Sequence, residues 1–347
     1  MDQLSRHWFD ETWCQIKSIC ELVDIGYTTA KRVEEAVSPF AMLPALLGDF
    51  EKTFIIRGFA ERCRTDGRDV DDYRPIWIES SVLHTTNGSA RVKIGTTDIL
   101  VGVKCQLIEC EDTSEESNQL RFTVEPSLFI YARARGKRKA VRSFARSIRM
   151  ALEAAYNGGE GAITNMNRLI LSNKFMWRIY VDVVILQHGG NVVDAVFIAV
   201  KAALSDTKVT QVRVVVHDEH LSFIHCDRST GPNFFRLEAA HAPLAVTVNQ
   251  IGDSIAVDCT TTEEAAVRTA LWVVMDQPEN ARIPDDQIRL RLIKQMGAGG
   301  IDPCSIPEMI DFALKIGREL HTAVKSRLEV IRNSDSSQVG SLSFHTG

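Results

Sequence analysis

Two stretches of the sequence decide the fold: GSARVKIGTTDILVGVK at residues 88–104 and YVDVVILQHGGNVVDAVFIAVKAAL at residues 180–204. In the first stretch, apolar residues alternate with polar ones on both sides of Gly95 and Thr96. A period of two across a glycine turn predicts a β-hairpin with one face buried.

The second stretch begins as an apolar strand over residues 180–186 and passes through Gly189 and Gly190 into an apolar helix. Backbone N–H groups at a helix start have no partner within the helix, so enzymes often bind phosphate at a strand, glycine pair and helix start of this kind. Here the loop continues as Asn191-Val192, which supplies neither a hydroxyl group nor a cation. Asp194, Lys201 and Ser205 mark a narrow polar edge on a helix that is otherwise apolar all round, which predicts a helix covered on both sides.

Three further motifs accompany these stretches: DGRDVDDYRPI at residues 66–76, VDCTTTEE at 257–264 and GAGGIDPCSIPEMIDFALKIGRELH at 297–321. In this order they resemble the RNase PH family, and in particular the ring subunits of the RNA exosome, over residues 47–330. The resemblance implies an α+β fold that is RNase PH-like, with internally duplicated layers of β-sheet and helix and a long C-terminal helix.

Composition agrees with a globular protein. Of the 347 residues, 45% are apolar and 24% are charged, which is ordinary for a folded domain. No apolar run reaches the roughly 18 residues of a membrane span, and Met1 opens a polar segment, not a secretory signal. A net charge of −5 argues against a generally basic nucleic-acid binder, so RNA contact requires a local patch. The eight cysteines are widely spaced and are interpreted as reduced thiols.

The chain divides into four predicted parts. Residues 1–48 form an N-terminal helical extension, because five apolar residues recur at steps of three and four on one helix face: Phe9, Trp13, Ile16, Cys20 and Val23. The first part of the RNase PH domain covers 49–205 and the second covers 206–332. Residues 333–347 form a polar tail, predicted to be disordered.

The pattern predicts helices over residues 47–63, 139–156 and 192–204, and a long helix from about residue 305. It predicts strands at 75–82, 90–94, 98–109, 120–131, 178–186, 209–217, 244–251 and 254–259. Residues 111–119 read as an acidic solvated loop.

The resemblance also bears on chemistry. Active RNase PH-type enzymes cut RNA from its 3′ end with inorganic phosphate, and they need a Thr-Arg or Ser-Arg pair after the double glycine and two acidic residues about six apart. In this chain Asn191 and Val192 replace the pair, Glu264 aligns with the first acid, and Ala270 aligns with the second. A phosphate dianion without a guanidinium would be left uncompensated. The expectation is therefore a degenerate site, with no catalytic residue and no cofactor. The alternative is an active phosphate-dependent 3′-to-5′ exoribonuclease.

A basic stretch follows the fourth predicted strand. The cations crowd one loop and continue at steps of four and three along the next helix, so they share one face. Silent family members usually carry a glycine-rich segment with two acidic residues here, and this chain departs from that pattern. In the family this loop lies beside the central channel. The candidate RNA-binding residues are Arg135, Lys137, Arg138, Lys139, Arg142 and Arg146. The alternative is a solvated helix face that pairs with neighbouring subunits.

The cluster HDEHLSFIHCD at residues 217–227 suggests zinc, but its spacing fits none of the usual ligand sets, and a charged hairpin tip explains it better. No metal site is therefore predicted.

The resemblance implies a non-catalytic, structural and RNA-contacting subunit of the exosome core ring, which supports 3′-to-5′ RNA processing and degradation, including rRNA maturation and mRNA decay. Expected partners are other RNase PH-like subunits in a six-membered ring, RNA-binding cap subunits, associated nucleases and single-stranded RNA, with no membrane contact. The expected location is the nucleus and nucleolus, and also the cytoplasm. A sister silent ring subunit remains an alternative identity.

Overall fold

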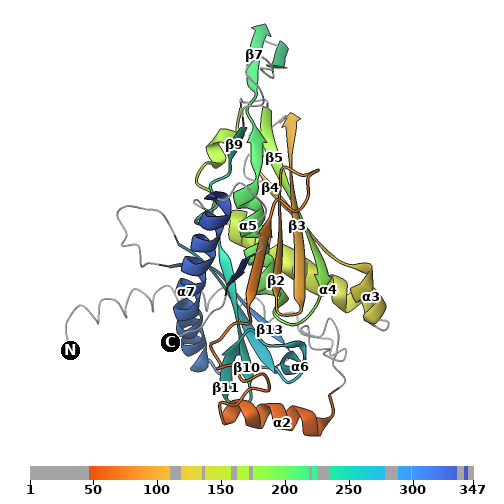
Figure 1. Ribbon diagram of the computed structural model, residues 1–347, viewed down its shortest axis with the longest axis vertical. Helices are drawn as coiled ribbons and strands as arrows, with labels where there is room; N and C mark the ends of the chain where they lie inside the picture. The colour runs from red at the N-terminus through yellow and green to blue at the C-terminus, as the bar shows by residue number, and fades with distance from the viewer. Residues whose placement is uncertain are drawn as a thin grey trace, which may run out of the picture. The chain divides into compact units, whose positions relative to one another are not determined.

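Figure 1 shows a computed structural model of the chain. It describes residues 47–109, 119–134, 137–157, 162–171, 175–218, 221–225, 234–277, 288–297, 299–333 and 340–342. The predicted N-terminal extension, except for its last two residues, and nearly all of the predicted acidic loop lie outside these ranges. Within the described ranges, none of the helices has both the length and the apolarity of a membrane span.

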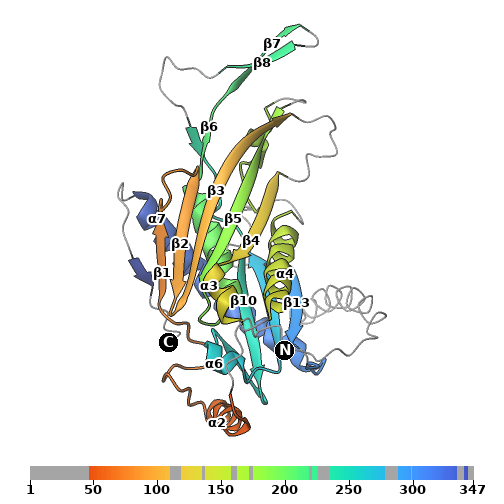
Figure 2. The same cartoon turned by 90° about the vertical axis from the view of Figure 1, so that its right-hand side faces the viewer.

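The predicted hairpin lies at the centre of a six-stranded sheet whose order is β14-β1-β2-β3-β5-β4 (Figure 2). β2 and β3 pair antiparallel from Gly88 opposite Val103 to Ile94 opposite Thr97, and Gly95 makes the turn with φ +54°. Neighbouring strands are antiparallel throughout, except that β4 runs parallel to β5. The strands are β1 (Ile76–Ser80), β2 (Gly88–Ile94), β3 (Thr97–Glu109), β4 (Leu120–Pro126), β5 (Phe175–Gln187) and β14 (Gly340–Leu342).

A second, four-stranded antiparallel sheet has the order β11-β10-β12-β13. Its strands are β10 (Leu244–Ile251), β11 (Ser254–Val257), β12 (Thr269–Asp276) and β13 (Arg289–Gly297). Sequence analysis missed β12 and β13. Every residue of β12 is buried, so the strand shows no alternation of apolar and polar residues by which to recognise it.

Helix α5 (Val192–Asp206) is the layer between the two sheets. It packs against β1, β2, β3 and β5 on one side and against β10 on the other, and all of its residues from Val192 to Leu204 are buried. The prediction of a helix covered on both sides is thus confirmed. Two of its charged residues, Asp194 and Lys201, face neighbouring elements and not solvent, since both are fully buried.

Two long amphipathic helices cover the outer faces (Figures 1 and 2). Helix α4 (Arg138–Asn157) packs against β4 and β13, and helix α7 (Ser305–Asn333) packs against β10, β12 and α5. Each buries a stripe at steps of three and four and leaves its charged face outside. The RNase PH-like α+β fold predicted from the sequence is confirmed.

The predicted strand over residues 120–131 is wrong in its second half. β4 ends at Pro126, and the chain turns at Ser127 into the short helix α3 (Leu128–Arg133). Proline has no N–H to continue a strand ladder, and the Ser127 N–H and hydroxyl donate to the Ile185 and Leu186 carbonyls at the end of β5. The alternating apolar residues after Pro126 were misread as a continuation of the strand.

Smaller elements complete the described chain. Helix α2 (Asp49–Ala60), the 3₁₀ turn η3 (Met166–Leu169) and the short helix α6 (Thr261–Glu264) lie outside the two sheets. The predicted strand at 209–217 divides into β6 (Lys208–Thr210), paired with β9 (Phe234–Arg236), and β7 (Arg213–Asp218), paired with β8 (Leu221–His225). In the tail predicted to be disordered, residues 340–342 form β14 on the edge of the first sheet, so the prediction needs correction there.

Candidate functional site

The loop between β5 and α5 is wedged tightly between two other segments. A Cβ atom on Gly189 would lie 2.6 Å from the carbonyl carbon of Thr96, and one on Gly190 would lie 2.7 Å from that of Thr260. Gly190 also has φ +94°. Both glycines are therefore required by the close approach of the β2–β3 turn and of the segment after β11.

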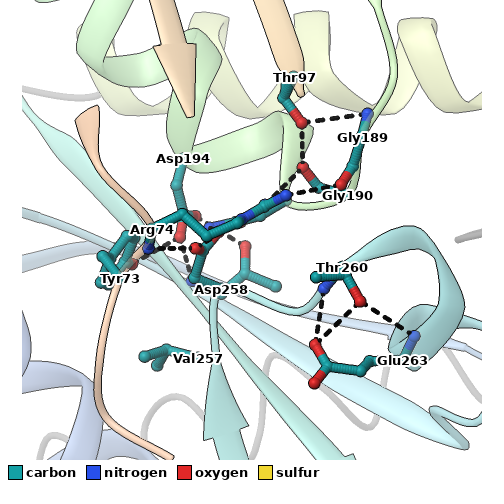
Figure 3. A network of polar contacts seen from close by, with 12 residues as sticks. Tyr73, Arg74, Thr97, Gly189, Gly190, Asp194, Val257, Asp258, Thr260 and Glu263 are labelled. Atoms are coloured by element: carbon teal, nitrogen blue, oxygen red, sulfur yellow. Dashed lines mark hydrogen bonds and ion pairs between the residues drawn. The ribbon is translucent and has the colours of Figure 1, made fainter. Parts of the chain in front are cut away.

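Arg74 holds this loop against the second half of the molecule (Figure 3). Its guanidinium donates to the Gly189 carbonyl at 2.7 Å and to the Gly190 carbonyl at 3.2 Å. It also forms a bidentate pair with the Asp258 carboxylate, at 2.7 Å and 2.8 Å. On the other side, the Thr97 hydroxyl donates to Gly190 O and accepts the Gly189 N–H. The loop is thus held from both directions by hydrogen bonds within the chain.

Asp258 is the centre of the charge cluster. It is fully buried and accepts from the Arg74 side chain and N–H, from Arg68 at 3.1 Å and from the Asn191 amide at 3.0 Å. Burial alone would raise the pKa of Asp258, but the hydrogen bonds and positive charge of Arg74 outweigh it, and the pKa lies below its ordinary value. Asp258 is therefore a paired carboxylate and not a poised general acid.

A second arginine–carboxylate pair lies beside the first. Arg64 forms a bidentate pair with Glu263, at 3.0 Å and 2.8 Å, and donates to the Asp258 carbonyl at 3.0 Å. Glu263 also accepts the Thr260 N–H at 2.8 Å and so closes the start of α6. Together, these contacts join three segments that are distant in sequence: 64–74, 189–191 and 258–264.

The Glu264 side chain accepts a hydrogen bond from the backbone at the start of α5. The Asn191 N–H donates to Glu264 Oε1 at 2.7 Å, and His188 Nε2 lies 3.7 Å from Glu264 Oε2. Burial raises the pKa of Glu264 to about 8. Asn191 adopts the left-handed conformation, φ 52° and ψ 48°, which asparagine tolerates better than most residues. An N–H group that could face an external anion is therefore bound to a carboxyl group of the chain itself.

The other two positions that the resemblance marks as replaced, Val192 and Ala270, carry apolar side chains. Val192 is buried at the first turn of α5. Ala270 is buried in β12, between Asn249 of β10 and Met296 of β13. Within the described residues, no group of three or more His, Cys, Asp and Glu side chains is arranged to hold a metal ion. We call residues Arg64, Arg68, Arg74, Asn191, Asp258, Glu263 and Glu264 the closed pocket.

Further buried polar contacts tie α5 to its neighbours. The Tyr73 hydroxyl donates to Asp194 at 2.7 Å, and the Thr247 hydroxyl donates to the same carboxylate at 2.8 Å. Burial raises the pKa of Asp194 to about 6. Further along the helix, Lys201 donates to the Ala242 carbonyl at 3.1 Å and lies 3.3 Å from His321 Nδ1 on α7. These contacts satisfy buried polar groups and are structural.

The predicted RNA-binding residues that the structure describes lie elsewhere, just before α4 and on its exposed side. Arg135 lies outside the described residues. The other five are exposed, and we call them the basic face: Lys137, Arg138, Lys139, Arg142 and Arg146. Within the described residues, ion pairing on this helix is limited to Arg149 with Glu153, at 4.0 Å. Phe144, the aromatic residue among the cations, is buried edge-to-face against Trp272.

The basic face includes the N-terminal turn of α4, where positive charge is unfavourable for the helix. The first turn of α4 carries no acidic residue and begins with Arg138 and Lys139. The N-terminus is the positive end of the helix dipole, where cations are destabilising. Helix and side chains therefore combine into one region of positive potential, which suits a polyanion.

Sequence analysis missed the arginines of the closed pocket. Arg68 and Arg74 lie inside the motif DGRDVDDYRPI, and Asp258 follows directly after β11, whose last two residues are buried. Arginines in a motif otherwise rich in aspartate were a usable signal of buried ion pairs, but the residues that they meet are about 115–190 positions away in the chain.

The sequence of the chain is similar to that of known proteins of one family. Residues 72–210 match the family model described as "3' exoribonuclease family, domain 1", RNase PH. A Dictyostelium discoideum protein named "Putative exosome complex exonuclease RRP42" is 28% identical, over 82% of this chain and 98% of its own length. "Exosome complex component Rrp42" of Pyrococcus abyssi is 30% identical, over 64% of this chain and 78% of its own length.

Solved structures show the same fold. A chain of a structure titled "Archaeal exosome core" superposes with a TM-score of 0.61 at 23% identity, over 80% of this chain and 97% of the other. A chain of the Archaeoglobus fulgidus exosome with RNA bound to the active site gives 0.60 at 22% identity, over 79% of this chain and 97% of the other. The chain therefore belongs to the RNase PH family and, within it, to the group of its Rrp42 relatives.

Proposed function

We propose that this chain is a non-catalytic ring subunit of an exosome core that contacts single-stranded RNA through the basic face. It pairs with related RNase PH-like subunits in a six-membered ring, beside RNA-binding cap subunits and attached nucleases. It supports 3′-to-5′ RNA processing and decay, including rRNA maturation and mRNA decay, in the nucleus, nucleolus and cytoplasm. The names of its relatives as exosome components support the assembly.

The bond from Asn191 N–H to Glu264 carries the proposal that the chain has no catalytic role. Phosphate is a dianion, and a buried phosphate site needs cations or N–H groups that are not already used. In the closed pocket, Arg74 and Arg64 are bidentate to Asp258 and Glu263, and Glu264 accepts the loop N–H. Val192 adds no cation, and the carboxyl groups of Asp258, Glu263 and Glu264 already use these donors, so a phosphate here would lack compensating charge.

The basic face carries the RNA-contacting part. The described residues offer these exposed cations no carboxylate partner. Such cations neutralise phosphates and release counterions, which is the main source of affinity for a single strand. The rest of a chain with net charge −5 would repel RNA, so binding concentrates on this helix.

The alternative is an active phosphate-dependent exoribonuclease. Its support is that Glu264 remains at the position of the first acid and that the Dictyostelium relative is named an exonuclease. It requires a second carboxylate, whose place Ala270 takes in β12.

Release of nucleoside diphosphates from a labelled single-stranded RNA, with and without phosphate, decides between the two. The purified chain should release none in either condition. Phosphate-dependent release that is lost in Glu264→Gln, a variant of nearly the same size, would establish the enzyme and refute the proposal. Release that Glu264→Gln leaves unchanged would indicate a contaminating nuclease.

A further inference from the structure

Helix α5 carries a buried lysine that belongs to neither the closed pocket nor the basic face. Lys201 is fully buried, and among the residues that the structure describes its Nζ contacts two acceptors, Ala242 O at 3.1 Å and His321 Nδ1 at 3.3 Å. Neither acceptor is negatively charged. An ammonium group has three N–H donors, whereas a neutral amine has two, so these two acceptors match the neutral amine.

The tautomer of His321 follows from its second contact. His321 Nε2 lies 3.1 Å from Met275 O, and a carbonyl oxygen can only accept, so Nε2 carries the proton. Burial is the main reason that the pKa of His321 lies well below its ordinary value. Nδ1 of the neutral ring therefore accepts from Lys201, and the hydrogen bonds join α5 to α7 and β12.

The carboxylate in β12 does not compensate a protonated amine. Asp276 follows Met275 and is fully buried, but Arg289 and Arg291 of β13 already contact both of its oxygens, at 2.6–3.1 Å. Within the described residues, Lys201 forms no ion pair with Asp276 or with another carboxylate. A proton on Lys201 would therefore add a buried charge without a counter-ion.

The other groups around Lys201 are positive or apolar. Lys325 lies one turn after His321 on α7, and His241, bound to Gln277 O at 2.6 Å, would add positive charge when protonated. Burial, and then the charge of Lys325, lower the pKa of Lys201 from 10.5 to about 7. The strands of the first sheet that pack on α5 contribute buried apolar side chains, among them Ala90, Val92, Val101 and Val103.

We infer that Lys201, His321 and the Ala242 carbonyl form a pH-sensitive latch, which holds α7 against α5 while the Lys201 amine is neutral and loosens α7 when the amine takes up a proton. The inference does not rest on the proposed function. Protonation adds a third N–H without an acceptor, together with the unpaired charge, and both are unfavourable in a buried place. They are relieved if α7 moves outward and the amine reaches water. Because α5 is enclosed between two sheets and α7 covers an outer face (Figure 1), α7 is the element that yields.

The protonation states give the direction of the pH effect. Between pH 7 and pH 10.5, a lysine in water holds a proton that the buried Lys201 has lost, so opening of α7 becomes easier as the pH falls through this range. Below pH 7 the amine is protonated in both states, and the effect levels off.

Hydrogen–deuterium exchange of the full-length chain, in whichever assembly it is recovered, measures the opening of α7 at pH 7, 8 and 9. Rates in residues 316–324 are divided by the intrinsic exchange rate at each pH, and β2 and β3 serve as the internal reference. The variants are Lys201→Met, which has no amine, and Lys201→Arg, which keeps its charge at every pH. Lys104→Met is the matched control, since Lys104 on β3 is exposed.

In the unmodified chain and in Lys104→Met, the opening of α7 should fall about 50-fold from pH 7 to pH 9, and by no more than about tenfold per unit. Lys201→Met should not show this fall, and Lys201→Arg should be open to the same degree at each pH. If opening in the unmodified chain is independent of pH, the inference is overturned whether or not the variants fold. The same fall in Lys201→Met would assign the titration to another group, and an equal fall in β2 and β3 would indicate global unfolding without a latch. Either result would also overturn it.

Discussion

The closed pocket and the basic face use the same kinds of side chain in opposite ways. In the pocket, Arg64 and Arg74 are buried and bidentate to carboxylates of the same chain. On α4, the cations are exposed at the positive end of a helix, and the described residues offer them no carboxylate. Buried arginines need such partners to be tolerated, whereas exposed ones remain available to an external anion. The comparison indicates that the chain keeps the family's fold with the charges of the closed pocket paired internally, and it supports the proposal that RNA is bound on the exposed basic face.

The largest expected effect on stability comes from removing a buried arginine of the closed pocket. Arg74→Ala leaves the Asp258 carboxylate buried without its bidentate partner and releases the Gly189 and Gly190 carbonyls. The free energy of unfolding should fall by about 3–5 kcal/mol, measured by urea denaturation or, for an assembled complex, by the thermal midpoint. Arg268→Ala, at an exposed position before β12, is the control and should stay within about 0.5 kcal/mol. Similar stability of the two variants would mean that the arginine lock does not hold the halves together.

Changes to the basic face should alter RNA binding and leave the free energy of unfolding nearly unchanged. Changing Arg138, Arg142 and Arg146 together to Glu should weaken RNA capture at least about tenfold and reduce the slope of log affinity against log salt by about 2, which is 0.7 for each of three phosphates. Folding and assembly should be retained, because exposed charges contribute only about 0–1 kcal/mol.

The matched control makes the same change of charge on α7, at the exposed residues Arg318, Lys325 and Arg332, and should affect RNA binding far less. Equal losses of RNA affinity in both triple variants would mean that the basic face acts only through the net charge of the chain. Loss of assembly in the α4 variant alone would make its cations partners of a neighbouring subunit.

A third expected effect is a pH dependence centred on Glu264. Its pKa is raised from 4.5 to about 8 by burial, so between these values the folded state holds a proton that the unfolded state has lost. The stability from this group is complete below pH 4.5 and decreases as the pH rises, by about 1.4 kcal/mol per unit. Glu264→Gln removes the titration and keeps an oxygen for the Asn191 N–H.

Urea denaturation at pH 5, 6.5 and 8, roughly spanning this window, checks the prediction. The variant should gain stability relative to the unmodified chain as the pH rises, and Glu329→Gln, exposed near the end of α7, should not. If the curves for Glu264→Gln and the unmodified chain run parallel, the Glu264 carboxyl does not titrate in this window.

The sequence predicted the fold well where a pattern repeats locally. The β2–β3 hairpin and α5, buried from Val192 to Leu204, follow from periods of two and from continuous apolarity. It failed where burial on both faces removes the pattern, as in β12, and where Pro126 ended a strand whose apolar alternation continued into α3.

The site was predictable only in part. Asn191, Val192 and Ala270 were identified as replacements by resemblance, and the exposure of the basic face agrees with its spacing. The closed pocket was not predicted, because its contacts join residues about 70–200 positions apart, such as Arg64 with Glu263 and Asn191 with Asp258. A single sequence carries no local pattern for such pairs.

Calorimetric titration of the full-length chain with inorganic phosphate tests the central claim most directly, since the claim is that the pocket is closed from within. The account predicts no saturable binding, for the unmodified chain and for Glu264→Gln alike, because Val192 supplies no cation and Arg64 and Arg74 remain paired. One-site phosphate binding to the unmodified chain, competed by single-stranded RNA, would contradict it and restore the pocket as an active site.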